Sequence, residues 1–252
     1  MDNKGVRLDS YLFESGMCHS RALAKKLILD FSVQVNGKTV TKPSTLIFDN
    51  DNVVLNDNKL TKYVSRGALK LEAALEYFNV SPNGLVCLDI GASTGGFTDV
   101  LLQQGAKCVY AVENGTGQLH EKLRADKRVI SLENTNARTL SHNLVPICDM
   151  AVMDVSFVSQ TLFYETLSDF LVDGGIFISL IKPQFEAGRE NLNKKGIVKD
   201  IKVREKVIDK VISSARTHGF EAKGICTSPI EGGDGNVEYL VCFTLHQEVK
   251  SQ

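Results

Sequence analysis

The feature that most constrains the fold of this chain is an alternation of short apolar strands and amphipathic helices that continues to residue 245. The predicted strands span residues 86–90, 108–113, 129–132, 150–155, 176–181, 222–226 and 238–245. The predicted helices lie near residues 66–78, 97–104, 117–125, 159–170 and 200–218. Apolar strands that alternate with helices of this kind indicate a parallel sheet covered on both faces. We therefore expect an α/β fold with a mostly parallel, seven-stranded sheet.

The N-terminal part follows a different pattern. Residues 7–30 contain two short stretches with helical periodicity, and the second begins at Ser20, a good helix N-cap. Asn36-Gly37 lies between two short apolar runs and is the strongest short-range signal for a β-hairpin. These features predict a small α+β unit that is separate from the larger α/β part.

Polar residues without periodicity mark the boundary between the two parts, at residues 56–61. The predicted organisation is a small domain in residues 1–58, a linker in residues 59–64 and the α/β domain in residues 65–252. The length of 252 residues suits one medium domain with a small module.

Charge is divided unevenly along the chain. The formal net charge is -1, yet residues 1–70 hold 11 Lys and Arg against 7 Asp and Glu, and the remainder is acidic. A small basic module on an acidic body favours a polyanionic partner such as nucleic acid. Chance variation in solvated surface charge is the alternative.

The six cysteines form no CxxC pair, no apolar leader follows Met1, and the five histidines lack the spacing of a zinc site. No stretch approaches the ~18 apolar residues that span a bilayer. We therefore expect a cytoplasmic protein with reduced thiols, no metal and no stable membrane association.

Residues 88–98 read Leu-Asp-Ile-Gly-Ala-Ser-Thr-Gly-Gly-Phe-Thr, which predicts a strand, a glycine-rich turn and a helix start. A Walker loop is disfavoured because Phe97 stands where its lysine is required, and a dinucleotide fingerprint because Ser93 replaces the second glycine. A site for S-adenosylmethionine, which carries no phosphate, and a purely structural turn remain. Glu113 favours the first, because an acidic residue at the end of the next strand can bind ribose hydroxyls.

Three ionisable residues, Asp154, Lys182 and Glu238, lie in or next to apolar strands. Charges beside buried strands are costly unless they are paired. In a parallel sheet, Asp154 and Lys182 share the edge that holds Gly91 and Glu113. A lysine near carboxylates in a cleft suits general-base catalysis; a structural ion pair at the sheet edge is the alternative.

Several motifs together resemble a known family. In the large part they are Arg66-Gly-Ala-Leu-Lys-Leu-Glu72, the run from Leu88 to Val100, Gly117-Gln-Leu-His120, Thr135-Asn-Ala-Arg138, Asp154-Val-Ser-Phe157, Ile181-Lys-Pro-Gln-Phe-Glu186 and Gly235-Asn-Val-Glu-Tyr239. In the small part they are Arg7-Leu-Asp9, Ser20-Arg21, Ala24 and Val35-Asn-Gly-Lys38. Over nearly the whole chain this set resembles the TlyA family, bacterial rRNA 2'-O-methyltransferases with an FtsJ-like domain that are often called hemolysins.

The resemblance implies a Rossmann-like, class I S-adenosylmethionine-dependent methyltransferase domain behind an S4-like RNA-binding domain. It implies an rRNA (cytidine-2'-O)-methyltransferase with a catalytic tetrad of Lys70, Asp154, Lys182 and Glu238. The cofactor residues would be Asp89, Gly91, Ala92, Ser93, Gly95, Gly96, Phe97, Thr98, Glu113, Asn136 and Asp154. The residues that contact ribosomal RNA or ribosomal subunits would be Arg7, Ser20, Arg21, Lys25, Lys26, Asn36 and Lys38.

The expected mechanism assigns the 2'-oxygen of the substrate to Lys182, which takes its proton or stabilises its developing charge. Asp154 and Glu238 would orient the Lys182 ammonium, and Lys70 would hold the ribose or repel that ammonium. Two alternative functions remain at this stage. They are a non-enzymatic RNA-binding or ribosome-assembly factor, and a membrane-lytic hemolysin.

Overall fold

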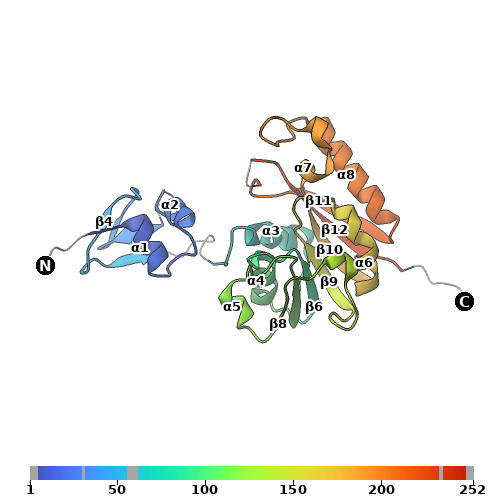
Figure 1. Ribbon diagram of the computed structural model, residues 1–252, viewed down its shortest axis with the longest axis horizontal. Helices are drawn as coiled ribbons and strands as arrows, with labels where there is room; N and C mark the ends of the chain where they lie inside the picture. Colours follow the sequence, from blue (N-terminus) through green and yellow to red (C-terminus); the bar gives the residue numbers. More distant parts are fainter. Residues whose placement is uncertain (1–4, 30–31, 56–61, 233–234, 248–252) are drawn as a thin grey trace, which may run out of the picture. The chain divides into compact units, whose positions relative to one another are not determined.

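The computed structural model describes residues 5–29, 32–55, 62–232 and 235–247. The chain forms two compact units, Met1–Arg66 and Gly67–Gln252 (Figure 1). The predicted linker at residues 59–64 falls in part on residues 59–61, which lie outside the described residues, so its bounds stay a prediction.

The small unit contains two helices and short strands around its own core. Its elements are β1 (Val6–Arg7), α1 (Leu8–Glu14), α2 (Arg21–Leu29), β2 (Val33–Val35), β3 (Lys38–Thr39), β4 (Leu46–Ile47) and β5 (Val53–Leu55). Leu8, Leu12 and Leu27 are fully buried between them. The predicted hairpin is confirmed: β2 pairs with β3, and Asn36 and Gly37 adopt φ values of 52° and 76°. Positive φ at both positions is what a tight two-residue hairpin turn requires.

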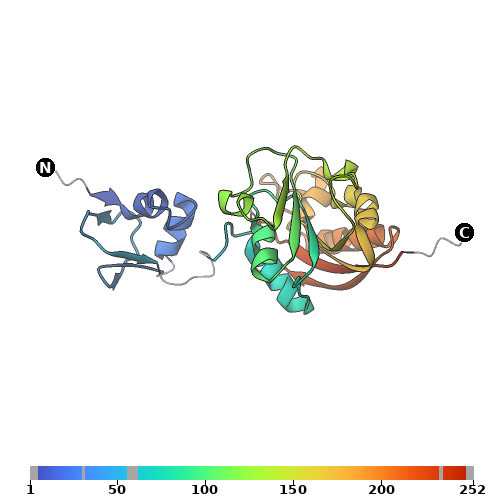
Figure 2. The ribbon, with the colours of Figure 1, turned by 90° about the horizontal axis from the view of Figure 1, so that it is seen from below.

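The large unit is a seven-stranded sheet with helices on both faces (Figures 1 and 2). Its strands are β6 (Val86–Ile90), β7 (Cys108–Val112), β8 (Val129–Leu132), β9 (Cys148–Met153), β10 (Leu171–Ile181), β11 (Phe220–Thr227) and β12 (Tyr239–Leu245). They are arranged in the order β11-β12-β10-β9-β6-β7-β8, and β12 alone runs opposite to the other six strands. The expected α/β class and mostly parallel sheet are confirmed.

The helices of the large unit are α3 (Ala68–Phe78), α4 (Gly96–Gln103), α5 (Glu121–Arg124), α6 (Tyr164–Phe170), α7 (Pro183–Glu186) and α8 (Ile201–Arg216). Three short 3-10 turns add η1 (Ala137–Thr139), η2 (Gln160–Phe163) and η3 (Arg189–Asn191). Helices α3 and α4 pack together on one face, and α6 and α8 lie on the other (Figure 2). A cluster of aromatic side chains, Tyr164, Phe177, Phe220 and Phe243, fills the core beneath α6 and α8.

One predicted helix is wrong in its extent. The sequence suggested a helix over residues 117–125, whereas α5 covers Glu121–Arg124 only. The carboxylate of Glu133 accepts hydrogen bonds from the backbone N–H groups of Gly117, Gln118 and Leu119, and Gly117 has a φ of 66°. The segment is a turn because the left-handed Gly117 and the extended His120, which is the N-cap of α5, both depart from helical backbone angles.

Parallel pairing places several strand ends together. Strands β6, β7, β9 and β10 run in the same direction, so the residues that follow them lie along one edge of the sheet. Because β12 runs in the opposite direction, its first residue also lies at this edge, where Tyr239 pairs with Ile181. Open α/β sheets bind their ligands at this edge.

Candidate active site

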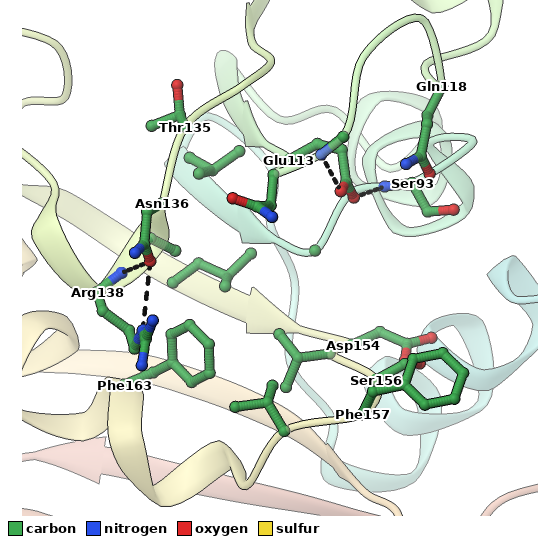
Figure 3. A pocket seen from close by; sticks show the side chains of 18 residues that line it. Ser93, Glu113, Gln118, Thr135, Asn136, Arg138, Asp154, Ser156, Phe157 and Phe163 are labelled. Atoms are coloured by element: carbon green, nitrogen blue, oxygen red, sulfur yellow. Dashed lines mark hydrogen bonds between the residues drawn. The ribbon is translucent and has the colours of Figure 1, made fainter.

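A cavity of about 660 Å³ opens at the carboxyl edge of the sheet. This volume lies within the range of about 300–1,000 Å³ typical of small-molecule sites. Its walls come from the segments that follow β6, β7, β8 and β9, and Figure 3 shows their side chains directed at a common space. The lining residues include Gly91, Ser93, Glu113, Gln118, Thr135, Asn136, Arg138, Asp154, Ser156, Phe157 and Phe163.

The glycine-rich turn brings the backbone of β6 against that of β9. Gly91 adopts a φ of 80°, and a Cβ atom built there would lie 2.6 Å from the carbonyl oxygen of Asp154. The amide nitrogens of Gly91 and Ala92 both donate to the carbonyl of Val112. Glycine is therefore required for both the conformation and the close approach of the two segments.

Glu113 closes the other side of the turn. Its carboxylate accepts a hydrogen bond from the Ser93 amide at 2.9 Å and one from the Gly115 amide at 2.8 Å (Figure 3). An ionised carboxylate has about four lone-pair positions, so two of them stay available for hydroxyl donors from the cavity. This geometry suits the ribose of a bound nucleoside.

Asp89 lies beneath the turn and is fully buried. The Thr98 hydroxyl donates to its Oδ2 at 2.6 Å, while its Oδ1 has no hydrogen-bond partner among the described residues. Burial raises the pKa of Asp89 to about 7, and the Thr98 bond opposes that rise. Asp89 ties the end of β6 to the first turn of α4.

The expected cofactor residues thus divide into two groups. Gly91, Ser93, Glu113, Asn136 and Asp154 line the cavity. Asp89, Ala92, Gly95, Gly96, Phe97 and Thr98 are buried behind it and shape the turn and the start of α4. Their roles toward a cofactor stay predictions.

The tetrad residues form two ion pairs. The Lys182 ammonium lies 2.5 Å from Oδ1 of Asp154 and donates a hydrogen bond to Oγ of Ser156 at 2.7 Å. The Asp154 contact lacks hydrogen-bond geometry, so this buried carboxylate oxygen has no hydrogen-bond donor among the described residues. Because Asp154 and Ser156 line the cavity, the pair places an amine directly behind the wall that they form.

Lys70 and Glu238 form the second pair, at 2.5 Å. Both are buried, with relative exposures of 7% and 2%. Glu238 therefore bonds to Lys70 instead of orienting the Lys182 ammonium as expected from the sequence. The pairing follows from the fold, because α3, which carries Lys70, packs against β12, which Glu238 precedes.

Sequence reasoning missed Phe157 as a separate feature, although it lies in the Asp154-Val-Ser-Phe157 motif. Its side chain is 91% exposed at the cavity, its φ is 64°, and its ring lies 5.0 Å from that of Phe185. Arg138 is a second cavity residue that was not singled out, and its Nε and backbone N–H both bond to Asn136. Exposure and φ, which single out Phe157, cannot be read from sequence.

The small unit spreads the expected RNA-binding residues over β1, α2 with its N-cap, and the hairpin. Lys25, Lys26 and Lys38 are exposed. Arg7 makes two hydrogen bonds to the buried Asp9, and the Arg21 guanidinium lies 3.6 Å from the same carboxylate. The Arg7 guanidinium holds the pKa of Asp9 below its usual value.

Two residues that were expected to contact RNA use their side chains for hydrogen bonds within the small unit. Ser20 Oγ accepts from the Leu23 amide, as an N-cap does. Asn36 bonds through its side-chain amide to Asp51 and Asn52, which fixes the hairpin turn. We infer that these two side chains shape the surface that the cations occupy.

Fold and site together define a class I methyltransferase domain behind an S4 unit, and comparisons with known proteins agree. The family model for FtsJ-like methyltransferases matches residues 63–245, and the model for S4 domains matches residues 6–53. Hemolysin A of Brachyspira hyodysenteriae is 43% identical over 95% of this chain and 100% of its own length. The 16S/23S rRNA (cytidine-2'-O)-methyltransferase TlyA of Mycobacterium tuberculosis is 39% identical over 94% and 88% of the two chains.

A solved structure from Streptococcus thermophilus that carries a hemolysin name is 44% identical and covers 98% of this chain and 90% of its own, with a TM-score of 0.76. The chain belongs to the TlyA family of FtsJ-like methyltransferases with an N-terminal S4 domain. Membership confirms S-adenosylmethionine as the cofactor. In the described part of the chain, no helix is long and apolar enough to cross a membrane.

The Gly91 turn gives a direct test of the cofactor site. Gly91→Ala is expected to weaken S-adenosylmethionine binding at least about tenfold, because a left-handed alanine costs about 1–2 kcal/mol and its methyl group meets the Asp154 carbonyl. Isothermal titration calorimetry measures the change. Gly84→Ala is the matched control, since Gly84 has a φ of 76° and nothing within 4 Å of the added atom. If both variants bind S-adenosylmethionine with the same affinity, the Gly91 turn is not part of the cofactor site.

Proposed function

We propose that this protein transfers the methyl group of S-adenosylmethionine to the 2'-hydroxyl of a cytidine ribose in ribosomal RNA. The observation that carries the proposal is the Lys182 ammonium held against Asp154 at the wall of the cavity. A hydroxyl becomes a strong nucleophile only when its proton is removed or its developing charge is stabilised. The relatives described above supply the substrate class, since one of them is named for cytidine 2'-O-methylation of rRNA.

The proposed mechanism divides the work among the tetrad. The cofactor supplies an activated methyl group on a positively charged sulfur. Lys182 takes the proton of the 2'-hydroxyl if it enters the reaction as the neutral amine, and stabilises the developing negative oxygen if it stays an ammonium; Asp154 and Ser156 fix its position. The Lys70–Glu238 pair holds the start of β12 against α3. Glu113 and Asn136, which line the cavity, would hold the nucleoside part of the cofactor.

Phe157 supports an RNA substrate at this site. An almost fully exposed aromatic ring with positive φ at a cavity is available to stack on a base that has left its helix. Such an extruded nucleotide presents its ribose hydroxyl to the cavity. Specificity for cytidine would then come from contacts to the edge of the stacked base.

Removal of the Phe157 ring is expected to weaken RNA use more than cofactor binding. Base stacking on an aromatic ring contributes about 1–3 kcal/mol, so Phe157→Ala should raise the KM for rRNA about 5- to 150-fold with an unchanged Kd for S-adenosylmethionine. Steady-state methyl transfer and calorimetry give the two values. Phe157→Tyr keeps a ring and should stay near wild type. An unchanged KM in Phe157→Ala would show that the ring does not contact the RNA.

The S4 domain supplies the sequence-independent part of the affinity in this proposal. Lys25, Lys26 and Lys38 are exposed and would contact phosphates, which set the position of the RNA and not its sequence. Such binding must weaken as salt is raised. Affinity for rRNA that does not change with salt would contradict this assignment.

The test of the proposed function is transfer of tritium from methyl-labelled S-adenosylmethionine to rRNA, with free RNA and isolated ribosomal subunits as separate substrates. Label is expected in the RNA of at least one of them. RNA binding with no cofactor uptake by calorimetry would favour the assembly-factor alternative. Leakage of dye-loaded liposomes without label transfer would favour the hemolysin alternative.

A further inference from the structure

A lysine-lined hollow lies on the large unit, outside the cavity described above. It has a volume of about 340 Å³ and is lined by Asn193, Lys194, Lys195, Ile197 and Lys199. The three lysines are exposed. Within residues 5–29, 32–55, 62–232 and 235–247, none of them has a carboxylate within ion-pair distance. Asp200, the nearest acidic residue in the chain, accepts from the Lys202 amide as the N-cap of α8. The hollow therefore carries three ammonium groups that no ion pair among the described residues neutralises.

The loop that forms the hollow has a defined shape. Oδ1 of Asn193 accepts hydrogen bonds from the amides of Lys195 and Ile197, at 2.8 and 3.0 Å. The Asn193 amide donates to the Ile197 carbonyl, and Val198 is buried beneath the loop. Because these bonds order the backbone, a ligand that binds the lysines does not have to order the loop itself.

Asn236 joins this loop to the active-site segment. Its side chain is 1% exposed. The side chain accepts a hydrogen bond from the Val198 amide at 3.1 Å and donates one to the Gly196 carbonyl at 3.0 Å. Asn236 lies two residues before Glu238, and the lysine loop itself follows Lys182 through α7. Figure 1 shows the loop between α7 and α8 beside the one that precedes β12. The hollow is thus attached to two of the four tetrad segments.

We propose that the hollow binds a backbone phosphate of the substrate RNA, close to the nucleotide that is methylated. This inference rests on the proposed function for the choice of RNA. Lysine ammonium groups pair with phosphates as point charges, and such contacts fix the register of a nucleic acid. Since Asn236 holds both the loop and the segment of Glu238, a phosphate bound in the hollow positions the RNA relative to the tetrad.

The first test removes the three charges in the full-length protein. The variant with Lys194→Gln, Lys195→Gln and Lys199→Gln should raise the KM for rRNA at least about fivefold, with a nearly unchanged kcat. The slope of log KM against log salt should fall by about 1 or more, because at least one phosphate contact is lost. The Kd for S-adenosylmethionine should stay unchanged, because no hollow residue lines the cofactor cavity.

A matched control removes the same charge at the opposite edge of the sheet. Lys107, Lys127 and Arg216 are exposed and precede β7, β8 and β11. Their combined replacement by glutamine should leave the KM for rRNA and the salt slope near wild type. An equal rise in KM for both triple variants would reduce the effect to net charge and overturn the proposed site, as would a wild-type KM in the lysine-loop variant.

The outcome separates this inference from the proposed function. If the wild type transfers label to rRNA and the lysine-loop variant behaves like wild type, the phosphate site in the hollow is refuted and the proposed function stands. If the wild type transfers no label, the proposed function fails. Fluorescence anisotropy with a labelled rRNA fragment then still tests the hollow, since the lysine-loop variant must bind more weakly than the control variant.

Discussion

Lys182→Ala is expected to lower kcat for methyl transfer to rRNA by about 100- to 10,000-fold, the range that a positioned proton acceptor contributes. The Kd for S-adenosylmethionine should change little, because Lys182 lies beyond the residues that line the cavity and reaches it through Asp154 and Ser156. Single-turnover label transfer and calorimetry measure the two effects. Turnover near the wild-type rate would overturn the assignment of Lys182.

Lys182→Arg separates the two roles proposed for the ammonium. Arginine keeps the positive charge but cannot lose its proton in a protein. If Lys182 accepts the proton of the 2'-hydroxyl, the arginine variant should be as inactive as the alanine variant. If Lys182 stabilises the negative oxygen, the arginine variant should retain a measurable part of the activity.

Glu238→Ala is expected to cost about 3–5 kcal/mol of the free energy of unfolding, because it leaves the buried Lys70 ammonium without its partner. Urea denaturation followed by circular dichroism gives this value, and the chain contains no tryptophan for a fluorescence probe. A loss below about 1 kcal/mol would mean that the pair is well solvated, contrary to its burial.

The double variant Lys70→Met with Glu238→Leu tests whether this pair does more than stabilise. Replacement of a buried ion pair by apolar residues of similar volume often restores stability. We expect stability near wild type and methyl transfer that stays strongly reduced, because the family resemblance assigns both residues to the catalytic tetrad and the double variant lacks both. Full activity in the double variant would make the pair a structural feature and remove Lys70 and Glu238 from the catalytic tetrad.

The carboxyl edge of the sheet could be predicted because it depends on local patterns. Apolar strands that alternate with helices determine which strands are parallel, and parallel strands end at one edge. Gly91, Glu113, Asp154 and Lys182 therefore had to lie along that edge, and the structure places them there. The Asn36-Gly37 hairpin was predictable for the same reason, since it depends on neighbouring residues only.

Features that depend on distant residues could not be predicted. Glu238 pairs with Lys70, which is 168 residues away in the chain. No local sequence pattern shows that Glu238 pairs with Lys70 and not with Lys182. The segment near Gly117, expected to be helical, forms a turn whose N–H groups bond to Glu133, a side chain from another segment. The exposed ring of Phe157 depends on a positive φ that only the folded backbone reveals.

Mass spectrometry of nucleosides from rRNA that the purified protein has methylated tests the central claim most directly, because it shows which atom receives the methyl group. Ribose methylation through a lysine-assisted hydroxyl predicts that 2'-O-methylcytidine accumulates with the wild type and not with Lys182→Ala. A methyl group found on a base atom, with the ribose unmodified, would contradict the account.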